Sequence, residues 1–598
     1  MCGISGVAGR HGEWTDEILA HRGPDGSAII RLDLAGVPAA LHHARLAIVD
    51  LTHAGDQPMA NEDGRFVMVF NGEIYNHLEL RAYCESKGHT FSSRMDGEVI
   101  LHLWEMEGYQ CLNRLNGIFA LAIADTKTGE LFLARDPMGV KPLLYATRAD
   151  GSITFASEPS AIVQLGGADD TPDTEALACF LTFLWVPDPL TPFTDIHSLP
   201  SGHVLTWRVG QTLTLARYRS MTPDPDAVQR RSSAQAEDEF SHHLRAACER
   251  QLLGDVPISI MASGGVDSSL IWEASRKGLA EAFTITWGVD EGEGSHEDGE
   301  AVTLLERSFG TPVTYLDGRK AADQYLPLGG DLFADPAFEL TRLIAQHTRA
   351  AGRKVLLSGQ GGDELFGGYR RHMVAPLLGR LSTGALGRNA PTLITRLPGG
   401  LQTEFVSRLV RASSHRDPFD RYMSLCTYST AAERAEVLDC DERDVSDEVV
   451  MARHRACWDS LPPNLSFLRK AMTLDLQVYM PGLGLSYVDR AGMEHGVEIR
   501  VPFLDLELVN WSFTLEDKHL VKRMTGKLIP KSLARKTIPR EAIDRPKRGF
   551  GAPSSTLASH GRTAGARGHR QGRYFNLASS ILDNWKQQHV SHETVRFD

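Results

Sequence analysis

The pattern of apolar positions in the second half of the chain predicts short buried strands that alternate with helices. Apolar runs at 258–261, 282–287 and 355–357 predict three strands. Helical spacing of apolar residues predicts helices at 240–252 and 301–309, and a helix start at 270–274, directly after the first strand. Residues 372–464 have a helical pattern, whereas the polar, Gly- and Arg-rich tail from about 561 predicts a loosely ordered end.

The first half of the chain has a pattern richer in strands. Apolar or alternating runs predict strands at 43–50, 66–70, 119–123 and 131–135. The segment 221–237 is polar and contains two prolines, which predicts a linker between two halves. A second polar segment, acidic and glycine-rich, predicts a solvated loop at 291–300.

A glycine turn joins the strand at 258–261 to the helix that follows it. Residues 263–269 are Ser-Gly-Gly-Val-Asp-Ser-Ser. A strand, a tight glycine turn and a helix start together form an anion site, because backbone N–H groups and the positive end of the helix dipole point at the ligand. No Gly-Lys-Ser/Thr closes the loop, so it is not a Walker A sequence. The alternative is an ordinary glycine turn capped by Ser or Asp.

Composition narrows the class of protein. The chain has 598 residues, which favours two to four domains, and its 42% hydrophobic and 23% charged content is that of an ordinary globular protein. A net charge of −13 argues against a nucleic-acid partner. No apolar stretch is long enough to predict a membrane span, and no secretory signal is visible. Eight scattered cysteines without CxxC spacing predict neither a zinc site nor disulfides, so we expect a cytoplasmic protein.

Cys2 differs from the other cysteines in its position. Once Met1 is removed, a thiol and a free α-amine belong to the same residue. The pKa of an α-amine is near 8, so a neutral amine is available to accept the thiol proton. One residue can therefore supply both nucleophile and base, although any residue can follow an initiator Met by chance.

Several motifs of the first half resemble those of the N-terminal-nucleophile glutamine amidotransferases. They are the start Cys-Gly-Ile-Ser-Gly, the Arg-Gly-Pro-Asp turn at 22–25, and Asn-Gly-Glu-Ile-Tyr-Asn at 71–76. The resemblance implies that Cys2 is the nucleophile and that Asn71 and Gly72 form the oxyanion hole. It also implies that Arg45 binds the α-carboxylate of glutamine. Glu73 and Asp96 are expected on its amine, with Met95 in place of the family's Ser.

The second half resembles enzymes that split ATP into AMP and pyrophosphate. Its first loop, 263–268, matches their pyrophosphate loop, and residues 358–369 match a second family loop at every position but one. The resemblance implies that Asp267 and Asp363 bind Mg²⁺ and that Lys527 stabilises the adenylate. The implied ATP-binding residues are Ser263, Gly264, Gly265, Asp267, Ser268, Ile285, Ser358 and Gly359.

Over nearly its whole length the chain resembles the glutamine-dependent asparagine synthetases of bacterial type. The resemblance implies an αββα glutaminase sandwich at 1–215, a linker at 216–237, and a doubly wound α/β synthetase domain with helical additions at 238–598. The implied substrates are glutamine, ATP and a carboxylic acid, with Mg²⁺ as cofactor, and a homodimer is left open. In the implied mechanism ammonia from glutamine crosses an enclosed route and displaces AMP from an acyl-adenylate.

Three departures from the family pattern concern the acceptor. Gln360 replaces a Glu, Tyr487 replaces a Lys, and Gly492 replaces a Ser within the segment 489–505, which we expect to brace the acceptor pocket by charge pairs. An amide cannot accept a proton as a carboxylate does; Glu364 and Glu339 are the nearest replacements. The expected function is that of an asparagine-synthetase-type amidotransferase, with aspartate or a related acid as the acceptor. The departures favour an alternative, a tailoring enzyme that transfers ammonia or a hydroxylamine-type nitrogen to an acid other than aspartate. Binding of glutamine or nucleotide without turnover is a further alternative.

Overall fold

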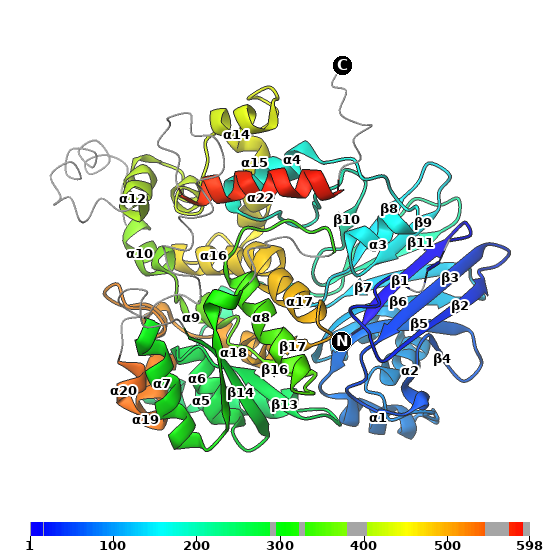
Figure 1. Ribbon diagram of the computed structural model, residues 1–598, viewed down its shortest axis with the longest axis horizontal. Helices are drawn as coiled ribbons and strands as arrows, with labels where there is room; N and C mark the ends of the chain where they lie inside the picture. The colour runs from blue at the N-terminus through cyan, green and yellow to red at the C-terminus, as the bar shows by residue number, and fades with distance from the viewer. Residues whose placement is uncertain are drawn as a thin grey trace.

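Two α/β domains lie side by side in the computed structural model (Figure 1), which describes residues 2–12, 14–15, 17–286, 295–321, 329–379, 404–544 and 573–589. The N-terminal domain contains two antiparallel sheets, drawn in blue and cyan, and the C-terminal domain contains one parallel sheet, drawn in green. None of the described helices is long and apolar enough to span a bilayer.

The N-terminal domain is a sandwich of two six-stranded sheets. One sheet has the order β10-β8-β9-β1-β3-β2, with strands at Gly3–Ala8 (β1), Gly26–Asp33 (β2), Pro38–Arg45 (β3), Leu144–Thr147 (β8), Ile153–Ala156 (β9) and His197–Ser198 (β10). The other has the order β12-β11-β7-β6-β5-β4, with strands at Met59–Ala60 (β4), Phe66–Ile74 (β5), Gly117–Asp125 (β6), Glu130–Arg135 (β7), His203–Arg208 (β11) and Thr214–Arg217 (β12).

Alternation along the strands explains the layers of this domain. In β5, Val67 and Val69 face the other sheet, while Phe66, Met68 and Phe70 face helices α1 (His77–Ser86) and α2 (Glu98–Glu107). Successive strand side chains point to opposite faces, so one strand supplies two cores. Helices α3 (Pro159–Gln164) and α4 (Thr174–Phe183) cover the outer face of the first sheet. The expected αββα sandwich is confirmed.

The C-terminal domain is built on a five-stranded parallel sheet of order β15-β14-β13-β16-β17. Its strands are Ile258–Met261 (β13), Leu279–Thr286 (β14), Val313–Asp317 (β15), Val355–Leu357 (β16) and Glu498–Arg500 (β17). From β13 the chain passes outward to β14 and β15, and it then returns to the other side of β13 to form β16 and β17. The loops after β13 and β16 therefore meet at the switch point of a doubly wound sheet, where such folds bind ligands.

Helices cover both faces of the parallel sheet. One face packs on α5 (Ser233–Gln251), α6 (Val266–Ser275), α7 (Ser295–Phe309), α19 (Leu528–Thr537) and α20 (Arg540–Ile543), and the other on α8 (Ala337–Ala350) and α17 (Leu485–Met493). The expected helical additions are present as α10 (Arg370–Leu378), α12 (Glu404–Ser414), α13 (Pro418–Met423), α14 (Ala431–Leu438), α15 (Asp447–Ser460), α16 (Phe467–Leu474), a π-helical stretch Asp475–Gly484, and α18 (Leu506–Phe513).

Four expectations about element boundaries differ from the structure. The strand expected at 43–50 ends at Arg45, helix α6 begins at Val266, and α7 begins at Ser295, inside the segment expected as an acidic loop. Helix α5 begins at Ser233 within the expected linker, because Ser232 and Gln235 form a capping box. The rest of the acidic segment, 291–294, lies outside the described residues.

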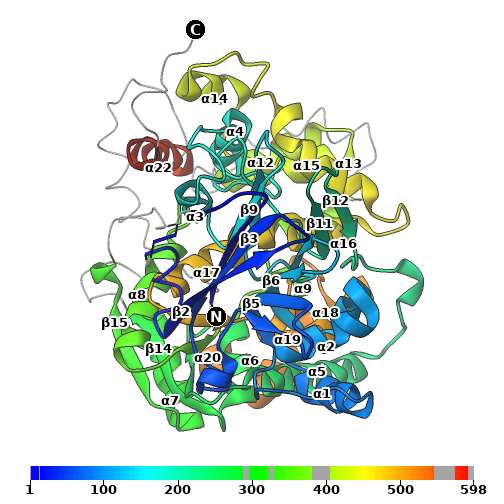
Figure 2. The same ribbon diagram turned by 90° about the vertical axis from the view of Figure 1, so that its right-hand side faces the viewer.

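The C-terminal tail is the largest difference. Residues 573–589, expected to be loosely ordered, form helix α22 (Arg573–His589), the red helix of Figures 1 and 2. Its Phe575, Ile581 and Trp585 are buried, and Trp585 Nε1 donates to the carbonyl of Gly330 at 3.0 Å. The helix packs on α4, so a partner distant in sequence stabilises it, and local composition gave no sign of that partner.

Candidate active sites

Cys2 lies at the start of β1 in a small pocket between the ends of several N-terminal strands. The predicted glutamine-binding residues Arg45, Glu73 and Asp96 line the same pocket, as does Gly72, predicted for the oxyanion hole. Burial raises the pKa of the Cys2 thiol, so the thiol needs a base to become a nucleophile. The pocket therefore brings together residues that are up to 94 positions apart in the sequence.

Asn71 is held beside Cys2 by strand β5. Its Oδ1 accepts a hydrogen bond from the main-chain nitrogen of Cys2 at 2.9 Å. Its Nδ2 is buried and has no partner, so it can donate to an oxyanion that forms on the substrate. The neighbouring Gly72 is required by packing, because a Cβ there would lie 2.0 Å from the carbonyl oxygen of Ile118 on β6.

Glu73 and Asp96 place two buried carboxyl groups at the far side of this pocket. Burial raises the pKa of both groups, and for Glu73 the nearby Arg500 opposes that rise. Glu73 Oε2 has no hydrogen-bond partner. An incoming ammonium group would offset the cost of these buried charges. Arg45 points to the opposite end, where its guanidinium donates to Asp56 at 2.6 Å and to the carbonyl oxygen of Thr52 at 2.8 Å.

The two loops that resemble the family's ATP-binding loops, 263–268 and 358–369, are called the phosphate-type loops. They meet at the switch point of the parallel sheet. In the first loop Gly264 has a φ of +69°, and Ser263 Oγ lies 2.9 Å from Ser268 Oγ. The second loop follows β16 and includes Ser358 and Gly359. A Cβ on Gly359 would lie 3.1 Å from the main-chain nitrogen of Ser268, so the loops touch through their backbones.

Lys527 lies between the two carboxylates that the sequence predicts as metal ligands. Its ammonium forms ion pairs with Asp267 and, at 2.7 Å, with Asp363. Burial opposes the charge on Lys527, but the two carboxylates raise its pKa above the ordinary value. Asp267 Oδ1 is buried without a partner. Two carboxylates from separate strand ends, one with an unsatisfied oxygen, are a donor set that fits a hard divalent cation.

Glycines allow this convergence. A Cβ on Gly368 would lie 1.7 Å from Asp363 Oδ1, and one on Gly362 would lie 2.8 Å from the Asp267 carboxyl. Lys527 itself has a φ of +56° and precedes α19, as expected for a residue that opens this helix. Ile285 lies near the end of β14 with its side chain mostly buried. The segment Arg545 to Phe550, which resembles the last part of the family's sequence pattern, lies outside the described residues.

Comparison with known proteins gives a match for each of the two domains. A family model described as glutamine amidotransferase domain matches residues 1–219, and one described as asparagine synthase matches residues 239–571. A putative glutamine-hydrolyzing asparagine synthetase of Mycobacterium tuberculosis (strain ATCC 25618 / H37Rv) is 32% identical over 92% of this chain and 88% of its own length. Asparagine synthetase [glutamine-hydrolyzing] 1 of Bacillus subtilis (strain 168) is 27% identical over 92% and 87%. The chain belongs to the asparagine synthase family.

Two of the three departures from the asparagine synthase pattern contact each other. Gln360 Nε2 donates a hydrogen bond to the hydroxyl oxygen of Tyr487. Burial raises the pKa of Tyr487 well above its ordinary value, so the pair is neutral. A Glu and a Lys at these positions could form an ion pair in the same place. The two changes therefore replace two charges of opposite sign by one hydrogen bond.

The third departure has a different cause. Gly492 lies in α17, and a Cβ there would lie 2.5 Å from the carbonyl oxygen of Val497. The residue packs α17 against the start of β17, and this close backbone packing explains the missing side chain. The expectation that Gly492 belongs to the acceptor site stays a prediction.

Two charged residues of 489–505, Asp489 and Arg500, form ion pairs across the domain interface. The expectation that this segment braces the acceptor pocket stays a prediction. Asp489 accepts from Arg22 at 2.8 Å, and Arg22 also donates to Glu158 at 2.8 Å. Arg500 lies 3.1 Å from Glu73 and is also paired with Glu498. Sequence motifs contain these residues but do not show their partners, because the two carboxylate partners of Arg22 are more than 130 positions away.

Arg500 connects the two sites directly. Its side chain reaches Glu73 in the Cys2 pocket, and its carbonyl oxygen accepts from the main-chain nitrogen of Ser358 at 2.8 Å. Ser358 begins the second phosphate-type loop. A single residue of β17 therefore touches the glutaminase pocket and holds the start of a synthetase loop.

Proposed function

We propose that this chain transfers the amide nitrogen of glutamine to a carboxylic acid that it activates with ATP. The observation that supports this most strongly is the convergence of Asp267, Asp363 and Lys527 at the switch point of the parallel sheet. The proposed nucleophile, Cys2, lies in the other domain, and Arg500 contacts both Glu73 of the Cys2 pocket and Ser358 of the second loop. A protein that only binds glutamine or nucleotide has no need of both sets.

The first reaction takes place at Cys2. After Met1 is removed, the α-amine accepts the thiol proton, and the sulfur attacks the side-chain carbonyl carbon of glutamine. Asn71 Nδ2 and the N–H of Gly72 stabilise the oxyanion. The C–N bond breaks, ammonia leaves with the proton, and water then hydrolyses the thioester to glutamate.

The second reaction takes place at the two loops. A carboxylate oxygen of the acceptor attacks the α-phosphorus of ATP, and the bond to the pyrophosphate oxygen breaks. The loop amides bind the leaving pyrophosphate. Asp267 and Asp363 would hold Mg²⁺, which neutralises phosphate charge when bound. Lys527 stays near both carboxylates and stabilises negative charge on the adenylate.

The third reaction joins the products of the first two. The ammonia lone pair attacks the acyl carbon, AMP leaves, and the positively charged nitrogen loses a proton to a base. Gln360 cannot serve as that base. Of the two carboxylates expected to replace it, Glu339 is paired with Arg342 at 2.8 Å, whereas burial and the neighbouring Asp363 raise the pKa of Glu364 to about 7. Glu364 is therefore the better proton acceptor.

The test is the stoichiometry of the reaction. Purified full-length protein is incubated with glutamine, MgATP and a panel of carboxylic acids, and glutamate, AMP and pyrophosphate are measured. We expect at least one acid to give AMP and pyrophosphate in equal amounts, together with a new amide. If glutamate forms but none of the acids in the panel causes AMP release, the proposal is contradicted.

A further inference from the structure

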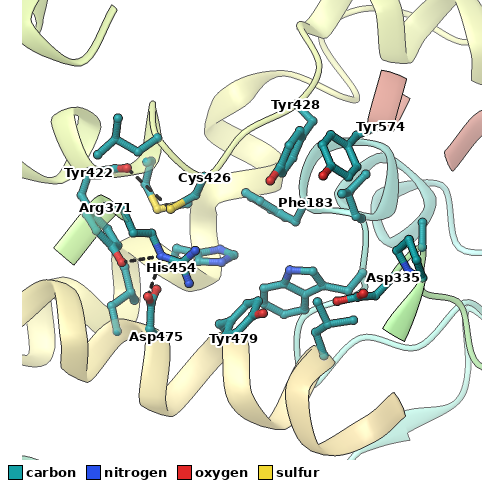
Figure 3. Close-up of a pocket in the computed structure, with 18 residues that line it drawn as sticks. Phe183, Asp335, Arg371, Tyr422, Cys426, Tyr428, His454, Asp475, Tyr479 and Tyr574 are labelled. Carbon is teal, nitrogen blue, oxygen red and sulfur yellow. Dashed lines mark hydrogen bonds and ion pairs between the residues drawn. The ribbon is translucent and has the colours of Figure 1, made fainter. Parts of the chain in front are cut away.

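A cavity of about 390 Å³ lies among helices of the C-terminal domain and the end of α4 (Figure 3). Asp335 and Tyr479 of its wall interact electrostatically with Tyr487. This volume is in the range of sites that bind small organic molecules. Its wall comes from both ends of the chain, because the end of α4 and Tyr574 of α22 contribute to it. The lining residues are Phe183, Leu184, Trp185, Ala334, Asp335, Pro336, Arg371, Tyr422, Met423, Leu425, Cys426, Tyr428, His454, Leu474, Asp475, Tyr479, Leu483 and Tyr574.

Aromatic rings form part of this wall. The ring centroid of His454 lies 4.4 Å from that of Phe183 and 5.7 Å from that of Trp185, and Trp185 and Tyr479 meet edge to face at 6.0 Å. Figure 3 shows Tyr428 and Tyr574 on the opposite side of the same space. Rings arranged around a cavity favour a planar aromatic guest, which can stack or meet their edges.

The charges of the cavity do not suit aspartate. Arg371 is the only cation among the described lining residues, and it is already paired with Asp475 at 2.7 Å and with the hydroxyl of Tyr422 at 3.0 Å. Asp335 adds a further carboxyl group. When one carboxylate of aspartate reacts, the other must be bound, and no unpaired cation of the described wall is available for it.

Contacts connect the cavity to the reacting groups. Tyr479 of the wall lies 5.9 Å, ring to ring, from Tyr369, whose hydroxyl donates to Glu364 at 2.6 Å. Glu364 directly follows Asp363 in the second loop. Tyr487, which receives the hydrogen bond from Gln360, has Asp335 and Tyr479 as electrostatic neighbours. The neutral pair therefore lies between the cavity and the loops.

His454 supplies one unsatisfied polar atom. The residue is buried in the wall, and its Nδ1 has no hydrogen-bond partner among the described residues. Burial lowers its pKa to about 4, so the imidazole is neutral at physiological pH. A neutral imidazole nitrogen exchanges a hydrogen bond with a hydroxyl group and does not bind a carboxylate strongly.

We propose that this cavity binds the acceptor, and that the acceptor is an aryl carboxylic acid with a hydroxyl group on its ring. The ring packs among Phe183, Trp185 and Tyr479, and the ring hydroxyl meets His454. The carboxylate extends past Gln360 and Tyr487 toward the loops. This inference rests on the proposed function and changes only the identity of the acid; the bonds made and broken are the same.

The test measures exchange of labelled pyrophosphate into ATP by the full-length protein, with aspartate, benzoate, 4-hydroxybenzoate and 4-hydroxycinnamate as separate probes. We expect a hydroxylated aryl acid to support exchange at least about 10-fold better than aspartate, since an unpaired buried charge costs more than a lost hydrogen bond. His454→Leu should raise KM roughly 10-fold for the hydroxylated acids. It should leave the KM of the unsubstituted acid unchanged.

Cys426→Trp fills the cavity, and Cys440→Trp is the matched control, because both cysteines are partly exposed and only Cys426 lines the cavity. We expect the first variant to lose aryl-acid exchange and the second to keep it, while both retain glutamine hydrolysis, which verifies folding. If the protein supports exchange with aspartate and Cys426→Trp leaves that exchange unchanged, the cavity inference is overturned but the proposed function is not. Absence of exchange with every acid, in a protein that hydrolyses glutamine, would overturn the proposed function as well.

Discussion

At the scale of single residues, each proposed reaction depends on a group whose ordinary chemistry the surroundings change. Burial makes the Cys2 thiol harder to ionise, and Asn71 holds the main-chain nitrogen that becomes its base. Two carboxylates keep Lys527 charged although it is almost completely buried. Because these groups lie in separate domains, substitutions can separate the two reactions.

Removal of the Cys2 thiol should affect one reaction only. Cys2→Ala is expected to abolish glutamine hydrolysis, because no other thiol lines the described pocket, and to leave amide formation from added ammonium salts intact. The measurement is glutamate release in parallel with AMP release from glutamine and from ammonium chloride. Loss of both activities in a folded variant would show that the domains do not divide the work in this way.

Loss of charge at Asp267 or Asp363, the proposed metal ligands, should impair adenylation and spare glutamine hydrolysis. Asp267→Asn or Asp363→Asn keeps the side-chain shape but removes one charge next to pyrophosphate, so adenylation should fall by at least about 10- to 100-fold. Glutamine hydrolysis should stay measurable and serves as the control. If pyrophosphate exchange were unimpaired in either variant, that carboxylate could not be a metal ligand.

Glu364 should give nitrogen transfer a pH dependence. Its pKa is about 7, so it is protonated below that pH and accepts a proton only above it. With ammonia as nucleophile, the ratio of wild-type to Glu364→Gln rates should be near one at pH 6 and rise through pH 7 toward roughly 10²-fold or more. Taking the ratio cancels the titration of ammonia itself. A ratio that does not change with pH would exclude Glu364 as the base.

At the scale of elements, the synthetase site depends on how closely two strand-to-helix loops approach each other. Parallel strands β13 and β16 are neighbours, so their carboxyl ends bring the loops together. Gly359, Gly362 and Gly368 let backbone and carboxylates approach within distances that a Cβ would prevent. The glycines of the second loop are therefore needed for contact with the first loop as well as for turn geometry.

Gly362→Ala tests this approach. The added Cβ would meet the carboxyl group of Asp267 and displace it. We therefore expect the rate of adenylation to fall at least about 10-fold. The matched control is Gly352→Ala, which has open space around it and a φ of +73°. That change should cost only about 1–2 kcal/mol of folding stability and leave kcat unchanged. Equal kinetic effects in the two variants would contradict the packing argument.

At the scale of the whole molecule, the two domains share a buried ionic interface. Arg22, Glu158 and Asp489 form one cluster across it, and Glu73, Glu498 and Arg500 form another. Buried ion pairs are costly to break, because removing one partner leaves an uncompensated charge. The interface therefore fixes the relative position of the domains, which suits an ammonia route that must exclude water.

Arg500→Lys tests whether this interface couples the sites. The substitution keeps a charge but loses the planar fork that reaches both Glu73 and Glu498. We expect glutamate to form in excess over AMP, since ammonia escapes, while synthesis from added ammonium changes less than about threefold. Arg65→Lys, at a pair with Asp125 within one domain, is the control. A ratio of glutamate to AMP that stays at one would show that Arg500 has no coupling role.

The sequence by itself determined the two-domain organisation and the strands at the sheet centre, and it predicted the residues that we propose for both sites. It could do so because those residues lie in contiguous motifs, where glycines, a nucleophile and carboxylates occur at fixed spacing. The strand β16 was predicted at its full length from a run of three apolar residues before the second loop. Local patterns are enough wherever a strand, a turn and a helix start follow one another in the chain.

Only the tertiary structure decided how those motifs meet. The pairing of Gln360 with Tyr487, the position of Lys527 between Asp267 and Asp363, and the contact of Arg500 with Glu73 each join residues more than 90 positions apart. Helix α22 forms because it packs on α4, and the aromatic cavity exists because distant elements leave space between them. Such contacts depend on packing between elements, which the spacing of residues along one chain does not encode.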